Sequence, residues 1–172
     1  TALDLAKEAG MRVVLMASTI TGFTPDAYVQ MSDAERIGAI QAQNIVDKLK
    51  LDTTSVENPK YVEVMLPRNT VSEDSSDADE SEQETDEFAA ATFRGVWNVL
   101  APYFQDGRAL SPSGLLTAET TTDDWRSVAF DASDEDAIAA ELTQRLGMDD
   151  ADAGHTRVDG IIAMNDYVAS SV

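Results

Sequence analysis

The stretch SDAERIGAIQAQNIVDKLKL at residues 32–51, followed by YVEVML at residues 61–66, decides the fold of this chain. Ser32 and Glu35 have the S-x-x-E spacing of a capping box, which predicts that a helix begins there. The small and apolar residues of this helix fall on one stripe, so this face should pack on a sheet. The stripe consists of Ala34, Gly38, Ala42, Ile45 and Leu49. The apolar run that follows predicts a strand.

The same alternation of helix and strand patterns precedes this stretch. Residues 3–9 predict a helix that ends at Gly10, a residue that readily adopts the left-handed conformation of a helix C-terminus. The continuous apolar run RVVLMA at residues 12–17 is typical of a strand that is buried on both faces. AYVQM at residues 27–31 predicts a second short strand.

The alternation also continues after the stretch. A helix is expected from about Phe88 to Tyr103, with Pro102 and Gly107 marking its end. ALSPSGLL at residues 109–116 predicts a strand that is broken by its proline.

The last third of the chain predicts one more helix and one more strand. SVAF at residues 127–130 leads into a helix that Ser133 should cap through an S-x-x-D pattern, and residues 158–166 form a final apolar strand. Strands that alternate with amphipathic helices predict an α/β fold with a doubly wound, mainly parallel sheet and helices on both faces. Because the pattern starts inside a helix at Thr1 and stops where a helix should follow Asp166, we expect an incomplete fold, a piece of a longer protein.

Composition excludes several classes of function. The 172 residues carry a net charge of −20, so a nucleic-acid partner or an anionic membrane surface is not expected. A hydrophobic fraction of 43% is sufficient for a packed core. The absence of cysteine excludes disulfides and thiolate metal sites.

An acidic run, SEDSSDADESEQETDE, occupies residues 72–87 and contains nine carboxylates without a lysine or arginine. Such a run predicts a solvated loop that is inserted between a strand and a helix. Its hard oxygen ligands also suit Ca²⁺, although the run lacks the central glycine and the spacing of an EF-hand loop. We therefore predict no metal site.

The sequence shows no catalytic pattern. It has no G-x-S-x-G motif, no glycine loop for phosphates and no metal cluster, and His155 stands alone in a polar loop. Neither an enzyme nor a bound cofactor is predicted.

Four segments together resemble the type I periplasmic sugar-binding proteins, the substrate-binding subunits of bacterial ABC importers, and within them the xylose and multiple-sugar group. These segments are KEAGMRVVLMAS (7–18), AYVQMSDAERIGAIQAQNIVDKLKL (27–51), FRGVWNVLAPYFQDGRAL (93–110) and VDGIIAMND (158–166). The resemblance covers nearly the whole chain apart from residues 69–86. SDAERIGAIQA and GIIAMND are its most specific parts.

The resemblance implies two α/β lobes joined by a hinge, with a sugar held between them. Residues 1–31 would form the end of the first lobe and the approach to the hinge, and residues 32–172 would form most of the second lobe. It also implies a carbohydrate ligand, ABC permease subunits as partners, an extracytoplasmic location and a monomer.

The resemblance also implies candidate ligand-binding residues. Asp166, next to Asn165 at the end of the last strand, matches a sugar-contacting aspartate, although both residue types also favour helix N-caps. Phe130 matches the place of a stacking tryptophan, although an aromatic residue at a strand end is equally at home in a core. Trp125 competes with it for that role.

Two further positions depart from the pattern of the family. Ala17 and Ser18 stand where the family has an Asp-Arg pair, and Glu87 and Phe88 stand where the xylose-like group has an Asn pair. Ser18 and Glu87 are the polar candidates at these places. The departures leave open an alternative function, a sensory or regulatory module of the same fold or a binding protein that has lost its sugar.

Overall fold

The computed structural model describes residues 2–16, 20, 22–29, 32–68, 78–147 and 157–171, with side chains from residue 86 onward in the helix that begins at Ala78. The chain divides into two compact units, Thr1–Asp33 and Ala34–Val172. The predicted division lies two residues earlier in the chain. Assignment of these units to a first and a second lobe stays a prediction.

The first unit contains helix α1 (Ala2–Glu8) and a parallel pair of strands, β1 (Val14–Met16) and β2 (Ala27–Val29). Gly10 follows the helix with φ of +82°, which confirms the predicted left-handed end. All three elements occur where the sequence pattern predicts them.

The prediction that the first strand is buried on both faces is wrong for the unit as it stands. The side chains of Val14 and Met16 are 54% and 62% exposed. Within the described residues of this unit β1 pairs only with β2, and a two-stranded ladder has no layer to cover its faces. Apolar content alone therefore does not predict burial here.

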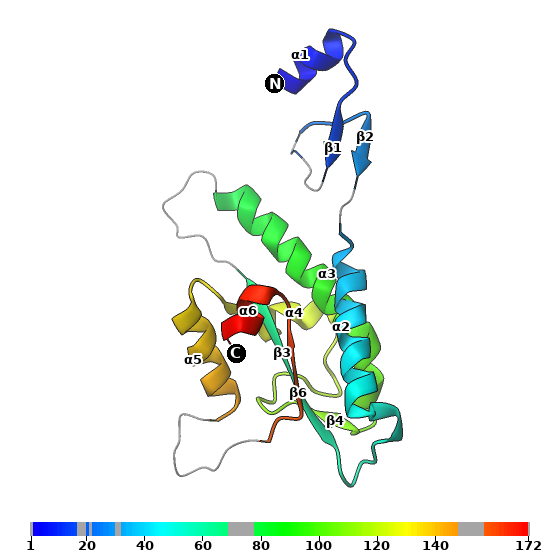
Figure 1. Ribbon diagram of the computed structural model, residues 1–172, viewed down its shortest axis with the longest axis vertical. Helices are drawn as coiled ribbons and strands as arrows, with labels where there is room; N and C mark the ends of the chain where they lie inside the picture. Colours follow the sequence, from blue (N-terminus) through cyan, green and yellow to red (C-terminus); the bar gives the residue numbers. More distant parts are fainter. Residues whose placement is uncertain are drawn as a thin grey trace. The chain divides into compact units, whose positions relative to one another are not determined.

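The second unit is built around β3 (Lys60–Arg68), the strand that the fold-deciding stretch predicts (Figure 1). Strand β4 (Ala109–Leu110) pairs with its first residues, β5 (Ala129–Asp131) with its last, and β6 (Gly160–Ala163) with its middle. All of these pairings are parallel, which confirms the predicted sheet.

Helices cover both faces of this sheet, as a doubly wound fold requires (Figure 1). Val62, Val64 and Leu66 join a core cluster with residues of two long helices, α2 (Ala34–Leu49) and α3 (Ala78–Gln105). Met65 points to the other face, where it meets residues of α5 (Glu135–Arg145) and α6 (Asp166–Ser171) in a second cluster. The remaining short helices are η1 (Leu51–Thr53), η2 (Thr122–Asp124) and α4 (Trp125–Val128).

The stripe of α2 packs on the sheet in part. Ile45 and Leu49 lie against Gly160 of β6, and Ala42 is buried in the core cluster that contains Val62 and Val64 of β3. Gly38 instead faces α3, where a Cβ atom would lie 2.0 Å from the carbonyl oxygen of Thr92. Gly95 of α3 faces the backbone of α2 in the same way, so the pair of glycines allows the two helices to lie in close contact.

Helix α3 begins at Ala78, about three turns before the predicted start near Phe88. The prediction of a loop for the whole run 72–87 is therefore wrong from Ala78 onward, while residues 72–77 lie outside the described residues. Alanine, glutamate and glutamine favour helix, and carboxylates near a helix N-terminus are stabilised by the helix dipole. Solvation and helix formation are thus compatible in this run.

One predicted helix cap differs from the structure, and another spans the division between the two units. The N-cap of α5 is Asp134, whose carboxylate accepts a 2.8 Å bond from the backbone N–H of Ala137, and not Ser133. The predicted capping box of Ser32 and Glu35 crosses the division between the units and stays a prediction. In the second unit, the carboxylate of Glu35 accepts from Arg94 at 3.0 Å and from Asn98 at 3.4 Å, which ties α2 to α3.

Candidate functional site

The candidate site lies at the carboxyl edge of the sheet in the second unit. Because β3, β5 and β6 are parallel, their final residues meet at one edge, and open α/β sheets bind ligands there. Arg68 ends β3 and is the register partner of Asp131, which ends β5. Asn165 and Asp166 follow β6 after one intervening residue, Met164. Four polar residues therefore end or follow three parallel strands at one edge of the sheet.

Asn165 and Asp166 have different surroundings at this edge. The side-chain oxygen of Asn165 accepts a 2.9 Å bond from the backbone N–H of Val168, so Asn165 caps α6. Asp166 is the first residue of the helix and is exposed. Asp166 is thus the more accessible acceptor of the two, and a ligand contact by either residue stays a prediction.

Phe130 is part of the core in this structure. Its side chain is 6% exposed and packs in the second cluster, and the guanidinium of Arg145 lies 5.5 Å from the centre of its ring. Trp125, the competing aromatic residue, is 7% exposed and has the guanidinium of Arg126 at 4.3 Å from its ring centre. Stacking of a sugar on either ring stays a prediction, and it would require the packing around the ring to open.

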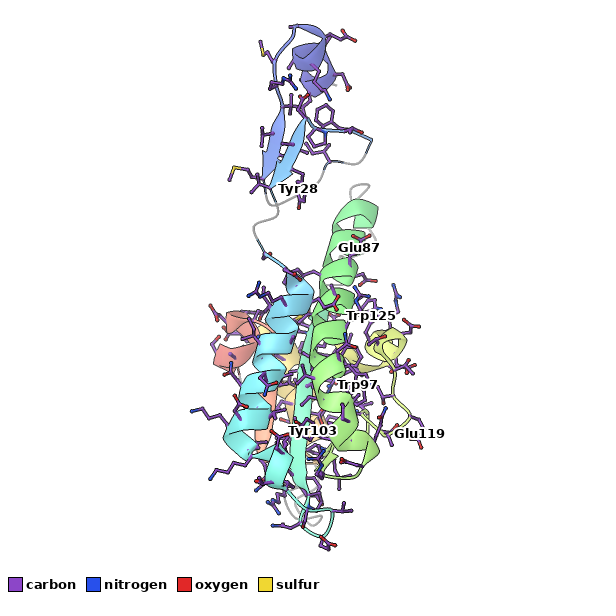
Figure 2. All side chains as sticks on the ribbon, turned by 90° about the vertical axis from the view of Figure 1, so that its right-hand side faces the viewer. Tyr28, Glu87, Trp97, Tyr103, Glu119 and Trp125 are labelled. Atoms are coloured by element: carbon purple, nitrogen blue, oxygen red, sulfur yellow. The ribbon has the colours of Figure 1, made fainter. Side chains whose placement is uncertain are left out.

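Glu87 is exposed on the N-terminal half of α3 (Figure 2). Its neighbour Asp86 forms a 2.9 Å ion pair with Arg126, which holds this part of α3 to the short helix α4. Phe88 is 39% exposed. Ser18 and Ala17 lie outside the described residues, so the structure brings together candidates from the second unit alone.

A buried ionic network centred on Glu63 of β3 was not predicted from the sequence. Glu63 is completely buried, and its carboxylate accepts a 3.2 Å bond from the guanidinium of Arg145, which is 4% exposed. The same guanidinium donates to the carbonyl oxygens of Val64 at 2.8 Å and Val128 at 2.7 Å. Arg145 therefore connects α5 to β3 and to the residue before β5.

The second oxygen of Glu63 connects the network to the chain after β4. It accepts from the hydroxyl of Ser111 at 3.1 Å and from the backbone N–H of Ser113 at 3.3 Å. The network therefore links α5, β3 and the chain after β4 through a fully buried carboxylate. A glutamate within the apolar run YVEVML was the one sequence signal of this network.

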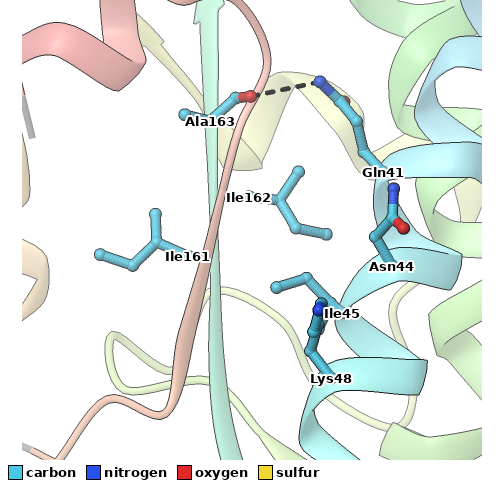
Figure 3. Close-up of a pocket in the computed structure, with 7 residues that line it drawn as sticks. All are labelled: Gln41, Asn44, Ile45, Lys48, Ile161, Ile162 and Ala163. Carbon is cyan, nitrogen blue, oxygen red and sulfur yellow. Dashed lines mark hydrogen bonds between the residues drawn. The ribbon is translucent and has the colours of Figure 1, made fainter.

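A cavity of about 240 Å³ lies along β6, on the side of α2 (Figure 3). The amide nitrogen of Gln41 donates to the carbonyl oxygens of Ala163 at 3.3 Å and Met164 at 3.2 Å. The side-chain oxygen of Gln41 is buried and has no hydrogen-bond partner in the described part of the chain. Apart from Gln41 the lining residues are Asn44, Ile45, Lys48, Ile161, Ile162 and Ala163.

The described residues contain no group of three or more His, Asp or Glu side chains that could hold a metal ion. In the same residues, no helix combines the length and the apolar character that a membrane crossing needs.

No family model and no curated protein matches this chain. Among solved structures, it is similar to an ABC transporter solute-binding protein from Clostridium phytofermentans with bound β-D-glucose, at a TM-score of 0.63 and 22% identity. The likeness covers 99% of this chain. The chain has the fold of a solute-binding protein.

This chain spans 44% of the length of that solute-binding protein. The likeness extends over both units, so the α/β architecture expected from the sequence resemblance is confirmed. At this identity the likeness concerns the solute-binding fold alone. Membership of the xylose and multiple-sugar group stays a prediction.

Proposed function

We propose that this chain is part of the substrate-binding component of an ABC importer and that it binds a sugar between two lobes. The observation that carries the proposal is the likeness of 99% of the chain to a solute-binding protein with bound glucose. In this proposal the protein works outside the cytoplasm as a monomer. Closure around the sugar creates the form that the membrane permease recognises.

The polar residues at the carboxyl edge support a hydroxyl-rich ligand. Asp166 and Glu87 are exposed carboxylates, which accept hydrogen bonds from hydroxyl groups, and the amide nitrogen of Asn165 can donate one. In this proposal they contact the sugar together with Ser18 of the first unit. Phe130 would provide the apolar surface beneath the sugar ring after local repacking.

A second candidate is a binding or sensory module of the same fold that no longer binds sugar. The burial of Phe130 and the capping role of the Asn165 side chain favour it, since both side chains already have partners within the protein. An upstream helix-turn-helix segment in the gene would support a regulator, whereas an export signal would support the importer.

The two candidates are separated by thermal unfolding in the presence of sugars. A ligand that binds only the folded state raises the melting temperature, and the rise grows with the logarithm of the ligand concentration above its Kd. We expect a rise with at least one sugar from a panel that contains D-glucose, D-xylose, D-galactose, L-arabinose and D-ribose. The absence of a shift with every sugar would reject the importer proposal and favour the second candidate. A shift with D-xylose would also support the xylose group.

A further inference from the structure

Gln41 of α2 holds the end of β6 through two hydrogen bonds. Its amide nitrogen donates to the carbonyl oxygens of Ala163 at 3.3 Å (Figure 3) and of Met164 at 3.2 Å. Successive carbonyl groups of a β-strand point in opposite directions, so one amide can reach both only where the chain turns. β6 ends at Ala163, and the chain bends at Met164 and Asn165 before α6 begins. Gln41 therefore fixes the turn between β6 and α6.

The same turn is also held by Asn165. Its side-chain oxygen accepts from the backbone N–H of Val168, and its backbone oxygen accepts from the backbone N–H of Ala169 at 3.0 Å. These bonds stabilise the first turn of α6, in which Asp166 is the first residue. The exposed side chain of Asp166 thus projects from a backbone that Gln41 and Asn165 hold together.

Stability alone does not explain the amide of Gln41. Its side-chain oxygen is buried and has no hydrogen-bond partner in the described part of the chain. An unpaired buried acceptor destabilises the folded state, whereas methionine has nearly the same length as glutamine and no such oxygen. Ile45, Ile162 and Ala163 line the same cavity and are apolar, so a methionine would suit this place. A role in positioning does explain the glutamine, because its two N–H groups can hold two carbonyl oxygens.

We propose that Gln41 is a positioning residue for ligand binding, which fixes the turn that carries Asp166 and does not itself contact the sugar. This inference rests on the proposed function, in which the carboxylate of Asp166 accepts a hydrogen bond from a sugar hydroxyl. Such a bond is strong only over a narrow range of distance and angle. Motion of the turn therefore weakens binding although every atom that touches the sugar is still present.

The first test follows the backbone of α6 in the absence of sugar. Hydrogen–deuterium exchange of residues 165–171 should be about tenfold faster in Gln41→Met than in wild type, because the turn loses the bonds from the amide. Exchange in α5 should stay the same. The melting temperature should stay close to that of wild type, since the unpaired oxygen is removed together with the two bonds.

The matched control is a glutamine on the same helix. Gln43 is exposed, and its amide nitrogen donates to the carboxylate of Asp47 at 2.9 Å within α2. Gln43→Met is the same substitution without contact to β6, so exchange in α6 should remain at the wild-type rate.

The second test measures the affinity for the sugar that gives the largest thermal shift. Gln41→Met should weaken binding about tenfold, and Gln43→Met should leave it unchanged. Gln41→Glu is a second variant that keeps the shape of the side chain. Its ionised carboxylate cannot donate to a carbonyl oxygen, so this variant should weaken binding at least as much.

The outcomes separate this inference from the proposed function. If the wild-type protein binds no sugar, both are overturned. If it binds a sugar and both Gln41 variants bind that sugar equally well, the inference is overturned and the proposed function stands. Unchanged exchange in α6 would show that Gln41 does not hold the turn. Faster exchange in every helix of the second unit would show that Gln41 serves overall stability, and either result overturns the inference.

Discussion

The guanidinium of Arg145 lies 3.2 Å from the carboxylate of Glu63, and both side chains are almost completely buried. The two residues come from α5 and β3, on opposite sides of the long segment that forms α3, β4 and β5. Their contact therefore joins the beginning and the end of the sheet unit. The remaining hydrogen bonds of the pair come from the hydroxyl of Ser111, from backbone groups and from the carboxylate of Glu141, which accepts from Nε of Arg145 at 2.6 Å.

Loss of one partner of this pair should strongly destabilise the second unit. Arg145→Met leaves the carboxylate of Glu63 buried without its cation, which costs about 3–5 kcal/mol. Denaturant unfolding followed by circular dichroism measures this loss. The double variant Glu63→Leu with Arg145→Met should recover most of it, because no buried charge then remains.

The matched control for this pair is a surface ion pair. Arg94→Met removes the 3.0 Å contact with Glu35, where both side chains are about half exposed, and should cost less than about 1 kcal/mol. Equal losses from Arg145→Met and Arg94→Met would show that the buried network is not important for stability.

The contact between α2 and α3 should not tolerate a single added methyl group. In Gly95→Ala, the new Cβ would lie 1.8 Å from the carbonyl oxygen of Glu35, which is backbone and cannot rotate away. The helices must separate, at a cost of about 1–3 kcal/mol. Ile40→Ala on the exposed side of α2 is the control and should change stability by less than about 0.5 kcal/mol. A neutral effect of Gly95→Ala in denaturant unfolding would contradict the close contact.

Asp159 should make the second unit sensitive to acid. Burial raises the pKa of its carboxyl group, but the backbone N–H of Tyr61 and the guanidinium of Arg157 lower it more, so that the pKa lies below its usual 3.8. A depressed pKa contributes stability that is present above about pH 4 and is lost as the pH falls through the folded-state value. The difference in unfolding free energy between wild type and Asp159→Asn should therefore shrink from about pH 7 to about pH 3. A difference that stays constant over this range would contradict the assignment.

Deletion of residues 72–85 should leave the second unit folded. The first buried residue of α3 in the described part of the chain is Ala89, and the ion pair of Asp86 with Arg126 remains in the deletion variant. Unfolding should stay cooperative, as measured by circular dichroism during heating. Loss of the cooperative transition would show that the acidic part of α3 is required for the fold.

The sequence by itself determined the local elements of this protein. The period of apolar residues predicts a helix within residues 33–51 and a strand over residues 61–66, and the structure has them at Ala34–Leu49 and Lys60–Arg68. Both patterns depend on neighbours within a few residues, so they can be read locally. Alternation of such elements was sufficient to predict a parallel α/β sheet. The start of α3 was misplaced, since a charged run does not reveal whether its backbone is helical.

Only the tertiary structure decided which side chains meet. Glu63 and Arg145 are 82 residues apart in the chain, and no local pattern connects them. The facing of Gly38 toward α3 and the burial of Phe130 are equally non-local. The physical reason is that the spacing of apolar residues along the chain indicates which face of a helix or strand avoids water. Contacts, ion pairs and the residues that form a site depend instead on what the folded chain places opposite that face.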